Sequence, residues 1–592
     1  MGKFSFWINR KFSNTGLLTG IFLGLLSFST AIAQQKRPLN IVSPAQDIST
    51  VQTGTVYLKG TGDPGNFLLM NNQPAKIYST GVFAAAIPLE MGQNEVLLKY
   101  GSGKDTLTRM LVITREAPSK PQPTAGFAIE YVKLSYDGDQ IWLQDGEQLE
   151  VEMKASPGMK ATFFKDIPMV EVPENQVGVA GIYRGAYKIN ASDVLKNQPI
   201  TFTLLNTKTN QKVHSTSKQK VTFLTEASLL VGVSNKPRTP LAYGLGGDRL
   251  GGAKMGFVDS LVYFEITGKM QGMYRVRLAE QVQAYLDEND VDILPGMGSR
   301  PSSITGSWSV TSDNKNDYVS IGLSQRLPYV SKMEESPARL VVDIYGAVSN
   351  SNWITQREGL VAIKNVWYEQ VSKDIFRAVI ELQDNEHWGH EISYRGNSLS
   401  IRVKPKPKQM ALRNLRIAVD AGHGGSNNGA IGLSGVLEKD LNLAMAKKLE
   451  AVLVKEGATV VMTRSNDRYT TNTQRLSFLK EHDPDLLISI HCNAAGNPLV
   501  SGGSTYYRHQ AFRPITQYIY KEMLKLDLAD FGNVGGFNFT LNSPTEFPSV
   551  LVEVAFVSNP ADEEKLLNPA FQDDIVKSIV TGVEKFLADR KQ

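Results

Sequence analysis

The sequence predicts a multidomain protein in which several small all-β modules precede a C-terminal α/β domain. Three observations support this fold class. With 592 residues, the chain is too long for a single hydrophobic core. Short apolar runs recur between turn residues from Leu39 to about Lys404, which is typical of β-rich modules. From Arg413 onward, strand-like and helix-like segments alternate, as in an α/β domain with a largely parallel sheet.

The composition is that of a folded protein. Hydrophobic residues make up 42% of the chain and charged residues 21%, which excludes an intrinsically disordered polymer. The formal net charge is +4, and the main basic cluster, Lys404–Lys408, alternates lysine with proline. Such a cluster is typical of a stiff, solvated linker. We therefore expect no nucleic-acid partner.

The N-terminus has the three parts of a secretory signal peptide. Basic residues precede the apolar stretch 17–26, and Ala31-Ile32-Ala33 provides a small-residue cleavage site. The pattern predicts a signal peptide over residues 1–33. An uncleaved anchor is the alternative, although the stretch is short for a membrane span. We expect secretion across the inner membrane to the periplasm or cell envelope, with no transmembrane span after signal cleavage.

The first three upstream modules are expected from the spacing of turns and short strands. Turn clusters such as Gly62-Asp63-Pro64-Gly65 separate the strands of residues 39–116, a spacing that resembles an Ig-like β-sandwich. A second all-β module is expected at residues 127–225. A third, at residues 228–296, has glycine-rich loops and resembles an SH3-like β module.

The glycine-rich run 244–254 in the third module raises the question of a phosphate-binding loop. That motif requires Gly-Lys-Ser/Thr directly before a helix. Here Lys254 follows Ala253 and precedes Met255, so the motif is absent from the sequence. We expect an ordinary loop of a β module.

The fourth module covers residues 303–404. The segments 339–346 and 376–382 carry apolar residues with period two, which predicts strands. Together with Leu327-Pro328-Tyr329, these segments resemble the AMIN domain. The resemblance implies a module that precedes cell-wall amidases and localises them on peptidoglycan.

The C-terminal domain, residues 413–592, contains the alternating elements. A helix is expected where Leu441, Met445 and Leu449 share one face, and it stops at Gly457. The other expected elements are strands at 417–419, 459–463, 486–490 and 550–556, and helices at 513–527 and 571–587.

Four polar residues of this domain stand where strands and helices should bring them together. His423 and His491 each follow an apolar strand, and Glu438 opens the first helix. Glu553 lies inside an apolar strand. Ligands at strand ends and helix starts converge at one edge of an α/β sheet. Two histidines and a carboxylate can hold zinc and leave one position open for water, and a second carboxylate can move the proton. Taken singly, each histidine is also compatible with a surface or hydrogen-bonded residue.

The segments around these residues carry motifs in a recognisable order. They are Asp420–Gly425, Leu437–Lys439, Thr463–Asp467, Ser489–Ala494 and Leu551–Asn559. The set resembles the zinc N-acetylmuramoyl-L-alanine amidases of the amidase-3 family.

This resemblance implies a role for each residue of the set. His423, Glu438 and His491 would be the zinc ligands, and Glu553 the catalytic glutamate. Supporting side chains around the ligands are a separate group of candidates. These candidates are Asp420, Ser489 and Asn493.

The same resemblance implies an enzyme with Zn²⁺ as its cofactor and peptidoglycan as its partner. It would hydrolyse the amide between N-acetylmuramic acid and L-alanine of the stem peptide, in cell-wall remodelling or daughter-cell separation. An envelope activator protein is a further partner compatible with this interpretation, but the sequence identifies none. Two alternatives stay open: a zinc peptidase or deacetylase of the envelope, and a wall-binding scaffold protein without catalysis.

Three other residues are of types that can act as nucleophiles or metal ligands. Cys492 follows His491 and should point to the opposite face of a continuing strand, so a small buried side chain is expected. As the only cysteine, it leaves the chain without an intramolecular disulfide. His387 and His390 flank Trp388 with no evident third ligand, and a surface turn is expected there.

Overall fold

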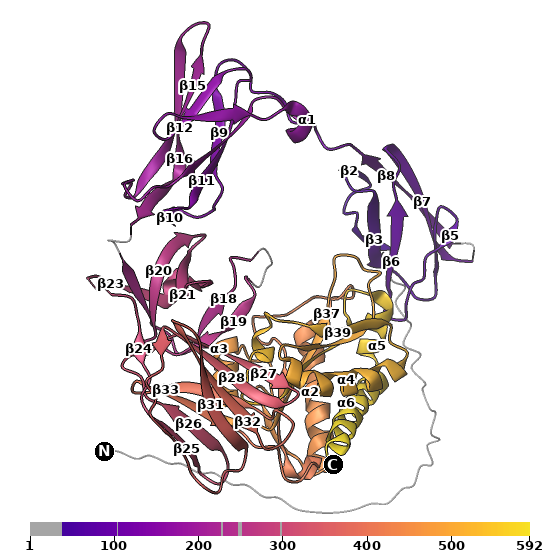
Figure 1. Ribbon diagram of the computed structural model, residues 1–592. Helices are drawn as coiled ribbons and strands as arrows, with labels where there is room; N and C mark the ends of the chain where they lie inside the picture. Colours follow the sequence, from indigo (N-terminus) through magenta and orange to yellow (C-terminus); the bar gives the residue numbers. More distant parts are fainter. Residues whose placement is uncertain (1–37, 104, 226–228, 247–250, 297–298, 592) are drawn as a thin grey trace, which may run out of the picture.

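The computed structural model describes residues 38–103, 105–225, 229–246, 251–296 and 299–591. The signal peptide expected over residues 1–33 lies outside the described residues. Among those described, no helix has the length and apolar character that crossing a membrane would require. As Figure 1 shows, β-rich modules make up the first two thirds of the chain, and the C-terminal domain is α/β.

The first module is a sandwich of two sheets. Its core contains Leu58, Phe83, Leu98 and Leu111, contributed by strands of both sheets. One sheet has the order β1 (Asn40–Ser43), β3 (Thr55–Thr61), β6 (Val82–Pro88), and the other has the order β2 (Ile48–Val51), β8 (Asp105–Arg115), β7 (Gly92–Ser102), β4 (Phe67–Met70), β5 (Gln73–Pro74).

The second and third modules are all-β apart from short helical turns, and a strand pairing joins them. Trp142 of β10 pairs with Lys269 of β20. The second module contains β9 (Ile129–Leu134), β10 (Gln140–Gln144), β11 (Gln148–Ala155), β12 (Lys160–Phe163), β13 (Ile167–Glu171), α1 (Glu174–Val177), β14 (Ile182–Lys188), β15 (Gln198–Asn206) and β16 (Gln211–Leu224). The third contains β17 (Leu230–Ser234), β18 (Thr239–Ala242), β19 (Lys254–Val258), β20 (Tyr263–Met270), β21 (Met273–Ala279), β22 (Val282–Asp287), η2 (Glu288–Asp290) and β23 (Val291–Leu294).

Lys254 begins strand β19, which pairs with β18, and no helix follows it. A phosphate-binding loop needs a helix at this point. The described part of this segment therefore fits the expectation of a β module, while residues 247–250 lie outside the described residues.

The fourth module is a sandwich of a five-stranded and a four-stranded sheet. Its apolar core is continuous with that of the third module, because Phe264 and Val276 belong to the same cluster as Trp308 and Phe376. The five-stranded sheet has the order β30 (Ile354–Gln356), β25 (Trp308–Ser312), β26 (Asp317–Ile321), β34 (Ser398–Val403), β33 (His390–Arg395). The four-stranded sheet has the order β27 (Tyr329–Glu335), β28 (Ala338–Tyr345), β32 (Ile375–Leu382), β31 (Ile363–Ser372), and a short pair, β24 (Ser303–Ile304) and β29 (Ala347–Val348), lies outside both.

The C-terminal domain is built around a six-stranded sheet, as the alternation of elements predicts. All neighbouring strands pair in parallel except β38 with β40. The strand order is β36 (Thr459–Met462), β35 (Arg416–Ala421), β37 (Leu486–Asn493), β40 (Ser549–Phe556), β38 (Gly503–Tyr507), β39 (Asp530–Gly535).

Helices cover both faces of this sheet. The larger core lies under α2 (Glu438–Lys455), α4 (Arg513–Met523) and α6 (Pro569–Asp589). On the other face, Leu479 of α3 (Asn472–His482) packs with Leu487 and Phe547. The remaining helical segments are α5 (Pro560–Leu567), η3 (Leu412–Asn414), η4 (Gln510–Phe512), η5 (Leu524–Leu526) and η6 (Thr540–Asn542).

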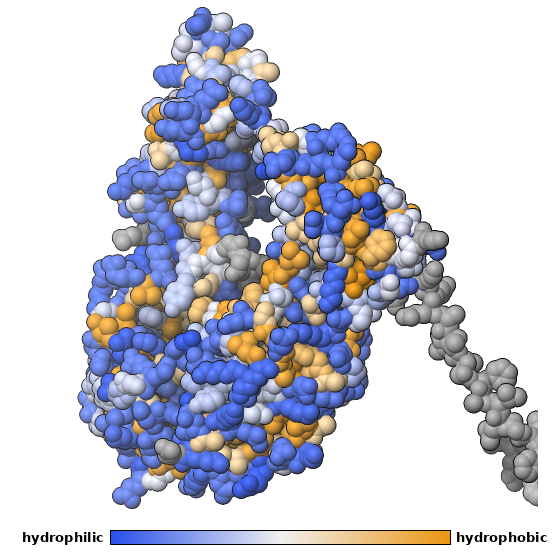
Figure 2. All heavy atoms as spheres, turned by 90° about the vertical axis from the view of Figure 1, so that its right-hand side faces the viewer, coloured by the Kyte–Doolittle hydropathy of each residue, from blue (hydrophilic) through white to orange (hydrophobic). Residues whose placement is uncertain are grey.

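The upstream modules lie against this domain. Trp388 of the fourth module is 1% exposed and stacks on Phe586 of α6, with ring centroids 6.0 Å apart. The first module also reaches the C-terminal domain, since the backbone N–H of Ser79 donates to Glu564 of α5 (Figure 1). The exterior seen in Figure 2 is mainly hydrophilic, with separate apolar patches.

The expectation of a surface turn at His387 and His390 is wrong. Both side chains are buried, at 8% and 2% exposure. The physical reason is domain packing: the His390 backbone N–H donates to the Thr545 carbonyl over 2.8 Å, which joins the fourth module to the C-terminal domain.

Candidate metal centre

The structure brings His423, Glu438 and His491 together. One ligand-type atom from each residue lies within 4.8 Å of the other two. The Glu438 Oε1 atom lies 3.2 Å from Nε2 of His423 and 3.1 Å from Nδ1 of His491. Two imidazoles and one carboxylate therefore face a common point.

The parallel sheet explains this meeting. Strands β35 and β37 are neighbours, with Ala421 opposite Ile490, so the turn after β35 faces His491. Glu438 is the first residue of α2, as expected. On the other side of β37, strand β40 places Glu553 directly opposite His491. Paired residues of neighbouring strands point to the same face of a sheet, so Glu553 lies beside the cluster and is 9% exposed.

The backbone at His423 is left-handed, with a φ of 62°. This conformation costs a non-glycine residue roughly 1–2 kcal/mol, so the surrounding structure must hold it. The preceding residue must be small: a Cβ at Gly422 would lie 2.3 Å from the His491 ring. The glycine therefore lets the two histidines approach, and their ring centroids are 5.0 Å apart.

Glu438 is held in its ionised form. Burial raises the pKa of this carboxyl, but its hydrogen bonds with His423 and His491 lower the pKa more, and the net pKa lies below the ordinary value. Its other oxygen accepts from the Ala430 backbone N–H over 2.8 Å. Asn442 Nδ2 donates to Oε1 over 3.1 Å. The carboxylate is thus oriented by fixed donors.

His491 is held in its protonated form when no metal is present. Burial lowers the pKa of this imidazole, but the hydrogen bond with Glu438 and the nearby charge of Glu553 raise it, to about 9 overall. A metal ion would take the place of that proton. The other histidine is oriented from behind, because His423 Nδ1 lies 3.0 Å from Oδ1 of Asn427.

Two of the three candidate supporting residues lie directly behind the ligands. Asp420 is fully buried and accepts from Thr463 Oγ1 over 2.6 Å and from Ser489 Oγ over 2.7 Å. Burial raises the pKa of Asp420, and the charge of Arg475 lowers it below the usual range. Asn493 lies on the same strand as His491 but is directed to Tyr506, at 3.5 Å.

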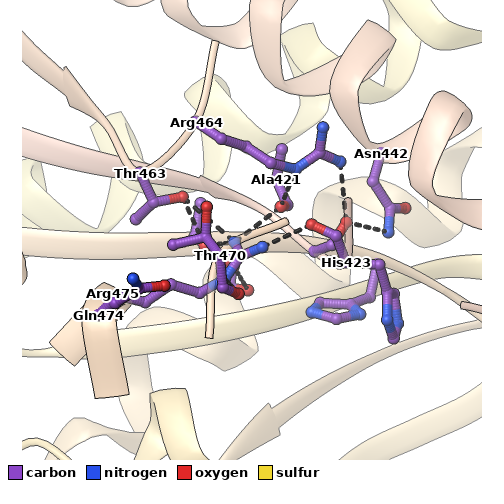
Figure 3. Close-up of polar contacts among 12 residues, drawn as sticks. Ala421, His423, Asn442, Thr463, Arg464, Thr470, Gln474 and Arg475 are labelled. Atoms are coloured by element: carbon purple, nitrogen blue, oxygen red, sulfur yellow. Dashed lines mark hydrogen bonds and ion pairs between the residues drawn. The ribbon is translucent and has the colours of Figure 1, made fainter. Parts of the chain in front are cut away.

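Sequence reasoning did not identify Arg475, and it gave Arg464 no role beyond its place in the Thr463–Asp467 segment. Both are buried behind the His423 turn (Figure 3). A signal for Arg475 existed: Thr471 and Gln474 form a capping box, which marks the start of α3 and places Arg475 in its first turn. The structure also confirms the expectation for Cys492, which is 2% exposed and packs into the core on the far side of β37.

Residues 417–585 match the family model described as N-acetylmuramoyl-L-alanine amidase. The chain is 34% identical over 175 residues to the uncharacterized protein YqiI of Bacillus subtilis (strain 168), a stretch that covers 29% of this chain and 84% of YqiI. The chain belongs to the N-acetylmuramoyl-L-alanine amidase family. This membership assigns peptidoglycan hydrolysis to the C-terminal domain, which we call the amidase domain below.

Two further relatives cover the same share of the chain. The N-acetylmuramoyl-L-alanine amidase LytC of Bacillus subtilis (strain 168) is 35% identical over 175 residues, which cover 29% of this chain and 35% of LytC. The solved catalytic domain of CwlV, an N-acetylmuramoyl-L-alanine amidase from Bacillus (Paenibacillus) polymyxa var. colistinus, is 34% identical, with 29% of this chain and 98% of that chain covered and a TM-score of 0.28. This chain thus spans about a third of the length of LytC. The upstream modules lie outside residues 417–585, which the family model matches.

Proposed function

We propose that this protein is a zinc-dependent N-acetylmuramoyl-L-alanine amidase of the cell envelope. It would cleave the amide between the lactyl group of N-acetylmuramic acid and L-alanine of the stem peptide. The observation that carries the proposal is the convergence of His423, Glu438 and His491 beside Glu553, in a domain of this family.

The donor set fits zinc. Imidazole nitrogens and a carboxylate oxygen are ordinary zinc ligands, and a catalytic site keeps three of them with one open position. Bonds of about 2.1 Å in a tetrahedron put neighbouring ligand atoms about 3.4 Å apart. The separations of 3.2 Å and 3.1 Å from Glu438 Oε1 to the two imidazoles are close to that value. When bound here, zinc would polarise the scissile carbonyl and lower the pKa of a water molecule.

The protein's own residues supply orientation and proton transfer. Glu438 stays ionised and is fixed by Ala430 and Asn442, so it needs no rearrangement to act as a ligand. Glu553, flanked by Val552 and Val554, would accept the proton of the attacking water and deliver it to the leaving amine of L-alanine.

Tyr506 lies on β38, which pairs with β40 beside Glu553. Its ring packs edge-on against Phe539, with centroids 5.2 Å apart. Burial and the charge of Glu553 raise the pKa of the Tyr506 hydroxyl, so this group stays protonated. A neutral hydroxyl beside two aromatic rings would suit a sugar or peptide that carries both polar and apolar surface.

The upstream modules would hold the enzyme on its polymeric substrate. We assign residues 39–116 as an Ig-like sandwich, 127–225 as an all-β module, 228–296 as an SH3-like module and 303–404 as an AMIN-like domain. The two-sheet sandwiches at the first and fourth positions support this assignment. Tethered binding modules raise the local concentration of an enzyme on its substrate. The role would be cell-wall remodelling or daughter-cell separation, with peptidoglycan as the partner.

Digestion of purified sacculi tests this function. The expected products are free stem peptides with a new L-alanine amino terminus and intact glycan chains, identified by mass spectrometry. Cleavage between two amino acids of the stem would indicate a zinc peptidase, and loss of acetyl groups a deacetylase. Binding without any product would leave only the scaffold interpretation.

A further inference from the structure

Two buried arginines hold the turn that carries His423 (Figure 3). Arg464 is 0% exposed and Arg475 2%. The carbonyl of Ala421 accepts from Arg464 Nε and from Arg475 Nη1, each over 2.8 Å. The next carbonyl, of Gly422, accepts from Arg464 Nη2 over 2.9 Å, and the carbonyl of His423 accepts from Arg475 Nη2. Three consecutive carbonyls are therefore bonded by two guanidinium groups.

These bonds supply hydrogen-bond donors to buried backbone carbonyls of the turn. The chain leaves β35 after Ala421 and enters the left-handed conformation at His423, and the carbonyls of this turn accept from buried arginines. A buried carbonyl requires a donor. A guanidinium offers five N–H groups in a rigid plane, which lets one side chain bond several fixed acceptors. The arginines thus stabilise the backbone conformation that orients the imidazole of His423.

The arginine contacts also reach the other two ligand segments. Arg464 Nη2 donates to the carbonyl of Lys439 over 2.8 Å, which is the residue after Glu438. Arg475 is paired with Asp420, and Asp420 accepts from Ser489, two residues before His491, over 2.7 Å. The two side chains therefore help to connect the turn with the start of α2 and, through Asp420, with strand β37.

We propose that Arg464 and Arg475 are positioning residues that preorganise the metal site before the metal arrives. They act through the backbone: none of their hydrogen bonds goes to an imidazole nitrogen or to the Glu438 carboxylate. This inference rests on the proposed function, because it takes His423, Glu438 and His491 as the ligands. It goes further by assigning metal affinity and coordination geometry to two residues outside the ligand set.

Lysine substitutions separate geometry from charge. Arg475→Lys keeps a positive charge beside Asp420, but one ammonium cannot bond Asp420 and the carbonyls of Ala421 and His423 in the planar arrangement of the arginine. Arg464→Lys likewise loses the bridge between Gly422 and Lys439. Arg468→Lys is the matched control, since Arg468 is exposed and its side chain donates to the Thr463 carbonyl, over 2.9 Å, and not to the carbonyls of the His423 turn.

The experiment uses the full chain and all three variants. Zinc affinity is measured by competition with a chelator, the absorption spectrum is recorded with Co²⁺ in the site, and melting is followed in the metal-free state. We expect zinc affinity to fall about 10- to 100-fold in Arg464→Lys and Arg475→Lys, as for other residues that orient metal ligands. The Co²⁺ spectrum should change in both, and Arg468→Lys should match the wild type in both readouts.

Wild-type zinc affinity and an unchanged Co²⁺ spectrum in Arg464→Lys and Arg475→Lys would overturn the inference, even with a lower melting temperature. Arg464→Lys and Arg475→Lys are measured in parallel, so that if one variant does not fold, the other still tests the positioning role. If the wild type binds no metal, the proposed function fails. The positioning role is then decided by crystal structures of metal-free Arg475→Lys and wild type: residue 423 leaving the left-handed region only in the variant supports it, and an unchanged turn contradicts it.

Discussion

Nδ1 of His491 lies 3.1 Å from Oε1 of Glu438, and in the metal-free chain this contact is a hydrogen bond between an imidazolium and a carboxylate. The same oxygen approaches His423 to 3.2 Å. A single proton-bearing network thus occupies the point where a metal ion would bind. Metal binding and proton release should therefore be coupled in this protein.

The first prediction follows from that coupling. The pKa of His491 is raised to about 9 in the metal-free chain, so this imidazole is protonated at pH 7 and must lose its proton when zinc binds. Zinc affinity should rise as the pH rises from 6 to about 9. Calorimetry in buffers of different ionisation enthalpy should show proton release on binding at pH 7. A zinc affinity that does not vary over this pH range would contradict the raised pKa of His491.

The second prediction concerns removal of a ligand. His423→Ala or His491→Ala should lose both bound zinc and hydrolysis, because two remaining ligands hold zinc poorly. Metal content is measured by elemental analysis, and activity by release of stem peptides from sacculi. Chelation of the wild type should abolish activity, and added zinc should restore it. A chelated, metal-free preparation with full activity would rule out the mechanism.

The third prediction concerns acid pH and the boundary between the fourth module and the amidase domain. His390 is 2% exposed, and burial lowers its pKa well below the ordinary value. In the unfolded chain its pKa is about 6.5. The stabilisation from keeping His390 neutral is therefore present above pH 6.5 and is lost as the pH falls below it.

This loss is measured as the melting temperature of the full chain between pH 8 and pH 5. The decline should be shallower in His390→Asn, which has no titrating group at this position. His509, whose pKa burial and the nearby Arg508 lower to about 4, should retain part of the decline. The control is His214→Gln, at an exposed histidine of β16, which should leave the slope unchanged. Equal slopes in His390→Asn and wild type would show that His390 does not contribute.

The fourth prediction concerns the upstream modules. A fragment from about Gln409 to Gln592 contains all four proposed catalytic and ligand residues and most of its own core, so it should fold and cleave small soluble muropeptides nearly as fast as the full chain. It should be markedly slower on intact sacculi. It lacks Trp388, which packs on Phe586, and we expect a lower melting temperature for this reason.

Trp388→Ala in the full chain isolates that contact, with an expected loss of about 3–5 kcal/mol in the free energy of unfolding. Wall binding is tested by co-sedimentation with sacculi. The segment used should span 228–408, because the third and fourth modules share one core. A folded fragment that is inactive on soluble substrate would mean that the upstream modules act on the site itself. Failure of 228–408 to pellet would assign these modules to another partner.

Much of this arrangement could be predicted from the sequence, and the physical reasons are specific. His423, His491 and Glu553 follow or interrupt apolar strands, and Glu438 opens a helix, so the convergence of parallel strands at one edge places all four. The part that could not be predicted depends on contacts between distant segments. Arg475 of α3 pairs with Asp420 of β35, and no periodicity encodes that pairing.

The sequence also did not predict which side chains are buried between domains. His390 lies in a short polar-looking segment, and its burial involves contacts with Ser331 of its own module and with Thr545 of the amidase domain. Trp388 likewise belongs to the fourth module in the sequence, but its side chain is part of the amidase-domain core. The burial of a side chain that packs against another domain cannot be predicted from the sequence around it, because it depends on the surface of that other domain.

The most direct test of the account compares Glu553→Gln with the wild type on the same purified sacculi. The amide keeps the size of the carboxylate but cannot accept a proton. We predict one zinc ion per chain and a near-native melting temperature in the variant, while release of peptides with an L-alanine amino terminus falls on the order of 10²–10⁴-fold. Loss of zinc in Glu553→Gln would make Glu553 a ligand, and wild-type turnover would exclude it as the proton-transfer residue; either result would contradict the account.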